Sequence, residues 1–186
     1  MSLILLGILN SQAAAAGGAG AYDLLETQVL TSSGSLSFTG LGTLAADYKH
    51  LQIRSVVRSG DGANRTFYAQ LNGDTNSNYS AHYLLGNGSA MYSGSYTNQQ
   101  RMYLGELPKS SEQYEPHIID ILDFSNSSKN TTIKHFWGHT QTVKTSGMTS
   151  GAWYNTNAVT SITLFDNGVA NLSAGSRFSL YGIKGA

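Results

Sequence analysis

Short segments in which apolar and polar residues alternate recur along the chain, and turn-forming residues separate them. In the segment 48–58, for example, Leu51 and Ile53 share one strand face while Gln52 and Arg54 share the other. Asn-Gly and Asp-Gly pairs follow several of these segments, as is usual for tight turns between strands. The pattern predicts strands at 22–30, 35–39, 48–58, 65–71, 79–85, 90–95, 101–104, 116–124, 131–139, 148–155, 159–165 and 177–183.

Two of these segments indicate how the strands assemble. The segment 177–183 alternates cleanly, and because chain ends fray unless they are docked, it predicts a closing strand in a sheet begun much earlier. The segment 116–124 is almost continuously apolar, which predicts a central strand. The segments 48–58 and 65–71, on either side of Asp61-Gly62, resemble a hairpin. No segment after residue 20 has sustained helical periodicity, so we expect an all-β antiparallel β-sandwich of jelly-roll type, with a single domain over 21–186.

The first twenty residues differ from the rest. An apolar stretch over 1–10 precedes an Ala/Gly tether, and it is too short to cross a bilayer. It has the length of a signal-peptide core but lacks the positively charged start. We expect an extended or short helical arm that buries Leu3, Ile4, Leu6 and Leu9 against a neighbouring subunit. The alternative is that the arm folds back onto its own domain.

Composition narrows the classes of partner. Charged residues make up 12% of the chain, and Lys+Arg and Asp+Glu number 11 each, so the net charge is zero. No overall field attracts phosphate backbones or anionic lipid, and we expect neither a nucleic acid nor a membrane as partner. With no cysteine, the chain has no disulfide or thiolate metal site. A polar but uncharged surface suits an assembly component or a carbohydrate binder.

Signatures of catalysis are missing from the sequence. There is no Gly-x-Ser-x-Gly elbow, no phosphate-binding loop with lysine and no His-Glu-x-x-His helix. His135 and His139 share a strand face around Trp137, but four strand residues separate them by roughly 13 Å, too far to chelate one metal ion. Glu115 and His117 share a face without a third ligand or a nucleophile. We therefore expect no catalytic residue, no metal site and no cofactor, and the protein is not expected to be an enzyme.

Tyrosine and tryptophan are frequent among Asn, Ser and Gly from residue 79 onward. Such residues form platforms on which sugars stack, and core packing and subunit contacts use the same types. The candidate glycan or interface contacts are Tyr92, Tyr96, Trp153 and Tyr154.

Several strand-like segments occur together in this chain: Leu-Leu-Gly at 5–7 before the Ala/Gly tether, 22–26, 48–54, 119–124 with 129–132, 158–162 and 176–184. In this combination the chain resembles a group of small β-rich virion structural proteins of aquatic bacteriophages. The resemblance covers most of the chain and is weakest over 72–101. It implies a homotrimeric jelly roll on the outer capsid surface that decorates and cements the head, with the major capsid protein as partner.

The sequence is also compatible with two other functions. The same resemblance allows a tail-fibre or receptor-binding module that recognises a host surface glycan, because a fold alone does not specify a location in the virion. A secreted lectin-like domain is the third interpretation, and it requires the first segment to be a cleaved signal peptide.

Overall fold

The computed structural model describes residues 21–109, 111, 113–139, 144–168 and 172–185. The expected N-terminal arm, with Leu3, Ile4, Leu6 and Leu9, lies outside the described residues. Within them, the chain forms one short 3₁₀ helix and twelve strands: β1 (Tyr22–Val29), β2 (Leu36–Thr39), η2 (Leu41–Ala46), β3 (His50–Val57), β4 (Arg65–Leu71), β5 (Tyr79–Gly86), β6 (Met91–Gln99), β7 (Met102–Leu107), β8 (Glu115–Leu122), β9 (Thr131–His139), β10 (Thr145–Trp153), β11 (Ser161–Asp166) and β12 (Arg177–Ile183).

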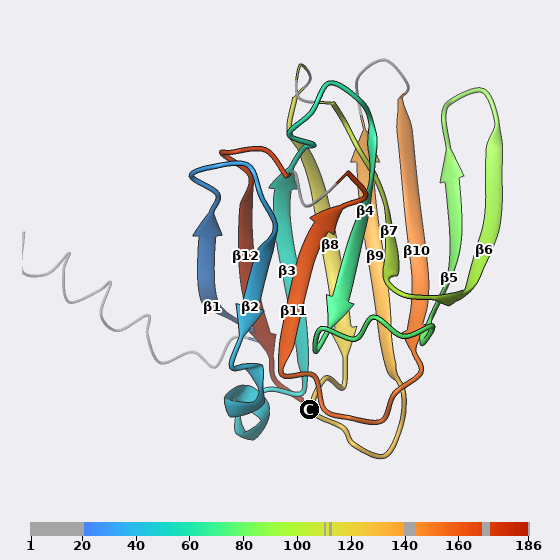
Figure 1. Ribbon diagram of the computed structural model, residues 1–186. Coiled ribbons are helices and arrows are strands. Elements are labelled where there is room, and N and C mark those ends of the chain that lie inside the picture. Colours follow the sequence, from blue (N-terminus) through green and yellow to red (C-terminus); the bar gives the residue numbers. More distant parts are fainter. Residues whose placement is uncertain (1–20, 110, 112, 140–143, 169–171, 186) are drawn as a thin grey trace, which may run out of the picture.

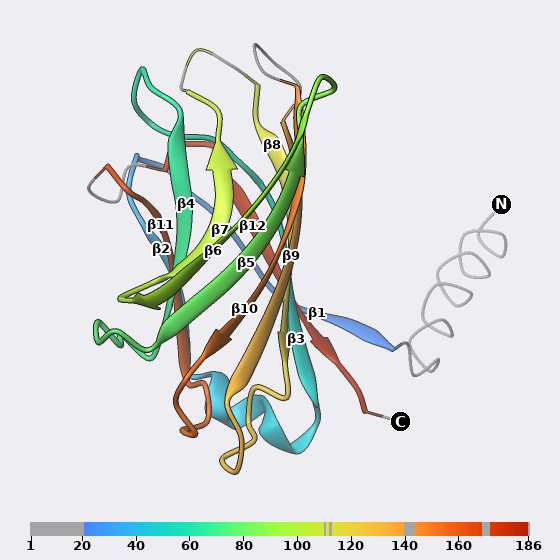
Figure 2. The same ribbon diagram turned by 90° about the vertical axis from the view of Figure 1, so that its right-hand side faces the viewer.

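The strands form two sheets that pack face to face. The large sheet has eight strands in the order β1-β12-β3-β8-β9-β10-β5-β6, and the small sheet has four in the order β2-β11-β4-β7 (Figure 1). Figure 2 shows the two layers from the side, with the β5–β6 hairpin leaning toward the small sheet. Every strand pair is antiparallel. The prediction of an all-β antiparallel sandwich is therefore confirmed.

The connectivity follows the jelly-roll pattern, in which the chain crosses repeatedly from one sheet to the other. Strands distant in the sequence become neighbours, so that β1 and β3 flank β12, while β2 and β4 flank β11. The prediction of a hairpin between 48–58 and 65–71 is wrong, because β3 belongs to the large sheet and β4 to the small one. Asp61 instead caps the crossover: it accepts hydrogen bonds from Arg65 and from the backbone of Ala63.

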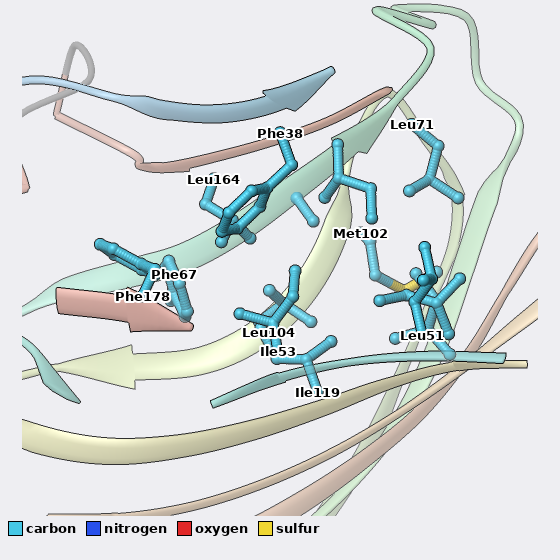
Figure 3. Packing of buried hydrophobic residues seen from close by; sticks show 14 of the residues in the cluster. Phe38, Leu51, Ile53, Phe67, Leu71, Met102, Leu104, Ile119, Leu164 and Phe178 are labelled. Atoms are coloured by element: carbon cyan, nitrogen blue, oxygen red, sulfur yellow. The ribbon is translucent and has the colours of Figure 1, made fainter. Parts of the chain in front are cut away.

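The core lies between the two sheets. Each contributes the apolar residues of its inner face, as Figure 3 shows for Ile53, Ile119 and Phe178 of the large sheet opposite Phe67 and Leu164 of the small one. All five are almost fully buried. Burying a side chain of this size contributes on the order of 1.5–3 kcal/mol relative to its exposure, so this layer supplies most of the driving force for folding.

Some segments differ from their predicted form. The short helix η2 was not predicted; it buries Leu41 at one end of the sandwich. No helix among the described residues is long and apolar enough to cross a membrane. The strand β10 begins at Thr145, three residues before the predicted start at 148. Its first three residues, Thr-Ser-Gly, have no apolar alternation that could be read from the sequence, but they pair with β9.

The strand β8 is central in the large sheet, as predicted from its apolar run. Its residues nevertheless alternate between buried and exposed, so only one of its faces is covered. Ile118 lies on the outer face and is 39% exposed. Packing in the core therefore does not account for the apolar residues on the outer face.

Candidate functional site

An apolar row crosses the outer face of the large sheet. Ile118 of β8 lies opposite Phe136 of β9, which lies opposite Met148 of β10, which in turn lies opposite Leu84 of β5. These side chains are exposed by 39%, 59%, 53% and 51%, respectively. Four large apolar side chains on adjacent strands form a contiguous patch, which on a soluble protein usually marks a binding surface.

A polar row runs beside the apolar one, two residues along each strand. The register places Gln52, Asp120, Lys134, Ser150, His82 and Ser95 on successive strands from β3 to β6. Side chains two residues apart point to the same face of a sheet and lie about 7 Å from each other along the strand. The two rows are therefore separated by about the width of one sugar ring or one amino-acid side chain.

A groove of about 770 Å³ follows these rows. Phe136, Met148, Leu84 and Ile118 line it together with Lys134, Asp120, Ser150, His82, Ser93 and Ser95. A second hollow of about 410 Å³ shares Ile118 with the first and is lined by Arg54, Arg177 and Tyr181 among others. The outer face thus carries two adjoining hollows that together extend from β12 to β6.

Hydrogen bonds hold the polar end of this surface in place. Gln52 donates from Nε2 to Oδ1 of Asp120 over 2.7 Å and accepts at Oε1 from Nε of Arg54 over 2.7 Å. The guanidinium of Arg54 lies 4.6 Å from the ring centre of Tyr181 and 5.4 Å from that of Tyr22. Because each group is fixed by the next, the Asp120 carboxylate is oriented before any ligand arrives.

The charges of the surface are unbalanced. Lys134 lines the groove, and Arg54 and Arg177 line the second hollow, whereas Asp120 is the one carboxylate among the described lining residues of both. In a chain of zero net charge this surface has a local excess of positive charge. A ligand with an acidic group is favoured there over a neutral one.

The aromatic residues chosen from the sequence do not gather in this groove. Trp153 is 1% exposed, stacks against Tyr79 in the interior and donates from Nε1 to Oδ2 of Asp74 over 2.8 Å. The expectation that Trp153 offers a surface contact is therefore wrong, since its ring completes the core. Tyr154 is exposed, and its hydroxyl accepts a hydrogen bond from Ser80.

Tyr92 and Tyr96 lie on the opposite face of β6 from the groove. The ring of Tyr96 stacks on Tyr83 at 5.7 Å and contacts Tyr103 at 5.0 Å, while remaining partly exposed. Tyr92 is exposed and lines a separate hollow of about 300 Å³ beside Glu106. Both are accessible, but the structure does not bring either together with the groove.

The residues of the apolar row were not selected from the sequence. Within 131–139, Ile133, His135 and Trp137 have the inward parity, and Phe136 has the opposite one. The signal for such a row is a large apolar residue at a strand position whose side chain points away from the core. This signal indicates a surface patch only when the neighbouring strands carry apolar residues at the paired positions, as Met148 does opposite Phe136.

A group of titratable side chains lies inside the sandwich, on the face of the large sheet opposite the groove. His117 and His135 are both buried, and Phe67 of the small sheet meets them edge on. Burial, reinforced by the neighbouring His117, lowers the pKa of His135 well below its usual value of 6.5. Glu115 shares the inner face and is also buried. In the described part of the chain, no three His, Asp or Glu side chains are placed to hold one metal ion.

Comparison with known proteins finds likeness only at the level of structure. No family model and no curated protein matches the chain. A Ruminococcus gnavus IT-sialidase CBM40 bound to α2,3-sialyllactose is 13% identical, with 85% of this chain and 91% of that chain covered and a TM-score of 0.35. A toad ovary galectin in complex with thio-digalactose is 12% identical, with 72% and 99% covered and a TM-score of 0.23. A Scytalido-glutamic peptidase is 9% identical, with 83% and 66% covered and a TM-score of 0.25.

Similarity at these TM-scores carries no inference about function. The resemblance of the sequence to phage virion proteins, and the trimer and capsid partner that it implies, stay predictions.

Proposed function

We propose that the chain is a carbohydrate-binding β-sandwich domain that holds a glycan in the groove on the outer face of the large sheet. The observation that carries this proposal is the pairing of two rows in register, one apolar and exposed, the other polar. Ligand sites of about 300–1,000 Å³ typically combine a mostly apolar lining with a few placed polar groups, and the groove has this size and character.

Sugars present two kinds of surface, and each row fits one of them. The C–H groups on one face of a pyranose ring pack on an aromatic ring, for which Phe136 offers an exposed ring at the centre of the apolar row. Hydroxyl groups need donors and acceptors, and Lys134, Ser150 and Asp120 supply both kinds from the polar row.

The groove favours binding over glycoside cleavage. Glycosidases generally use two carboxyl groups about 5–9.5 Å apart. Asp120 is the sole carboxylate among the described residues that line the main groove. His135 borders the groove, but it is buried, as is His117, and both have the inward parity of their strands. We therefore propose a binding module rather than an enzyme.

The proposal is tested by screening the protein on a glycan array and titrating the strongest ligands by calorimetry. Replacement Phe136→Ala should weaken binding about tenfold or more, since loss of a stacking contact costs on the order of 1.4 kcal/mol. Tyr154→Ala is the matched control, because Tyr154 is similarly exposed but lies outside the groove lining. The proposal fails if no glycan binds, or if both variants bind as the unmodified protein does.

A second candidate function is contact with another virion protein, as the sequence resemblance implies. One observation favours it: exposed apolar side chains continue beyond the groove at both ends, at Val56 and Met91. Such a strip would also suit a capsid surface to which a decoration protein binds. Quantitative mass spectrometry of purified virions distinguishes the cases. Near-stoichiometric abundance relative to the major capsid protein supports decoration, a low copy number supports a glycan-binding tail module, and absence from virions contradicts any virion role.

A further inference from the structure

The strand β6 forms one edge of the large sheet. Among the described residues its only strand neighbour is β5, as Figure 1 shows at the right-hand side of the sheet. Every residue of β6 is exposed except Gly94, which is partly buried. The outer edge of β6 therefore presents backbone N–H and C=O groups that another strand can pair with.

The other three edges of the sandwich are protected in ways that β6 is not. At the opposite edge of the large sheet, β1 carries Asp23 and Glu26 and has a bulge between Leu24 and Glu26. In the small sheet, β2 is only four residues long, and β7 has a register shift opposite β4 and carries Glu106. From Met91 to Tyr96, β6 has no charge and no proline, and its irregularity comes only after Tyr96.

The sequence of this exposed edge reads the same in both directions: Tyr92-Ser93-Gly94-Ser95-Tyr96. An antiparallel strand pair with a two-fold axis at Gly94 places Tyr92 of one copy opposite Tyr96 of the other, and Ser93 opposite Ser95. Every such pair is made twice in a two-fold interface. Cross-strand tyrosine pairs stabilise sheets, and no like charges face each other in this register.

We propose that β6 pairs with β6 of a second copy of this chain, so that two large sheets join into one continuous sheet across a two-fold axis at Gly94. The zero net charge of the chain removes long-range repulsion between the copies. Ser93 and Ser95 line the groove as well as the edge, so the grooves of the two copies meet at the axis. The dimer does not depend on the identity of the groove ligand, and it is tested without one.

The register is tested by disulfide trapping, for which a chain without cysteine gives a clean background. Residues directly opposite in an antiparallel pair have Cα atoms about 4.5–5.5 Å apart, within reach of a disulfide, whereas diagonal neighbours lie about 7–8 Å apart. A mixture of the Ser93→Cys and Ser95→Cys variants should form a disulfide-linked dimer under mild oxidation. Each variant alone should cross-link far less.

A charge-exchange experiment tests the same interface without covalent trapping. The double variant Ser93→Lys/Ser95→Lys places lysines opposite lysines, and Ser93→Glu/Ser95→Glu does the same with carboxylates, so each should be monomeric in sedimentation equilibrium. An equimolar mixture of the two should recover a dimer, because opposite charges then face each other. Leu24→Lys on β1 is the matched control, since it adds a charge to an exposed position on the opposite edge and should leave the dimer intact.

Three results would overturn the inference. The unmodified protein could remain monomeric at concentrations up to about 1 mM, where even weak self-association is detected. It could sediment as a trimer, as the virion resemblance implies. Finally, Leu24→Lys could disrupt the dimer while both double variants on β6 retain it, which would place the interface at β1.

Discussion

His117 and His135 stack against each other in the interior, with ring centres 5.1 Å apart and planes within 6° of parallel. Nδ1 of His117 lies 3.0 Å from Nε2 of His135, so one ring donates a hydrogen bond to the other. Neighbouring strands β8 and β9 bring the two side chains together on the buried face of the large sheet.

This pair predicts that acid destabilises the fold. Burial, followed by the effect of His117, lowers the pKa of His135 well below 6.5, so the unfolded chain binds a proton there that the folded chain does not. Stability is therefore fully present above about pH 6.5 and falls as the pH drops below it, by up to about 1.4 kcal/mol per pH unit for one histidine. Urea unfolding between pH 7.5 and 5 measures this slope.

Two controls separate His135 from other titrating groups. NMR titration of the unmodified protein should show no protonation of His135 near pH 6.5. The variant His135→Gln should flatten the pH dependence of the free energy of unfolding, and His82→Gln should not. Equal slopes in both variants would contradict the assignment.

Asp74 anchors Trp153 at the end of β10. Burial opposes ionisation of Asp74, but hydrogen bonds from Asn78, Trp153 and Asn76 outweigh it and lower the pKa of Asp74 to about 2. The replacement Asp74→Asn should lower the free energy of unfolding by about 1–3 kcal/mol at pH 7, since hydrogen bonds to a charged acceptor are stronger than those to a neutral one. Chemical denaturation measures the change, with Asp47→Asn at an exposed carboxylate as the control.

The contribution of Asp74 also has a defined pH window. Because its pKa is lower in the folded than in the unfolded chain, its stabilising effect is present above about pH 4 and disappears as the pH falls toward 2. The difference in stability between the unmodified protein and Asp74→Asn should therefore shrink over this range. A difference that stays constant down to pH 2 would count against the ionised carboxylate as its source.

Gly105 allows the ring of Trp137 to pack inside the sandwich. A Cβ at Gly105 would lie 2.4 Å from Nε1 of Trp137, and the residue has a φ of +102°, which L side chains rarely adopt. The variant Gly105→Ala should lose about 2–4 kcal/mol of stability, combining steric overlap with backbone strain. Gly62→Ala, where a Cβ meets nothing within 4 Å, should change stability by less than about 0.5 kcal/mol. Similar losses in both would contradict the packing argument.

The charge of the groove predicts a preference among glycans, on the premise that the groove binds sugar. Lys134→Gln should weaken binding of an acidic glycan by about tenfold, as expected for loss of one hydrogen bond to a charged group, and should leave a neutral glycan of similar size nearly unaffected. Raising the salt concentration should reduce only the first affinity. Calorimetric titration of both ligands tests this, and equal losses for the two would contradict an electrostatic role for Lys134.

Local patterns in the sequence are enough to locate most strands. The predicted bounds 65–71, 131–139 and 177–183 coincide with β4, β9 and β12. Alternation with a period of two is a property of the extended chain itself, so it can be read wherever one face is more apolar than the other. It fails at 145–147, where Thr, Ser and Gly have no apolar contrast and pairing with β9 and β5 determines that the segment is a strand.

The exposed groove on the large sheet could not be located in the same way. Trp153 and Phe136 are both large aromatic residues on strands, and one is buried while the other is exposed in the groove. The difference arises because the small sheet covers only one face of the large sheet. Neither residue by itself shows whether its side chain points to the covered face or to the open one.

The sequence by itself thus determined the strands, the all-β class and the absence of cysteine and of net charge, because these depend on local pattern and composition. Only the tertiary structure decided the order of strands in each sheet, the burial of Trp153 and of the His117–His135 pair, and the alignment of Phe136 with Met148. Each of these results from pairing between strands distant in the sequence, whose register is set by how the two sheets bury their apolar faces together.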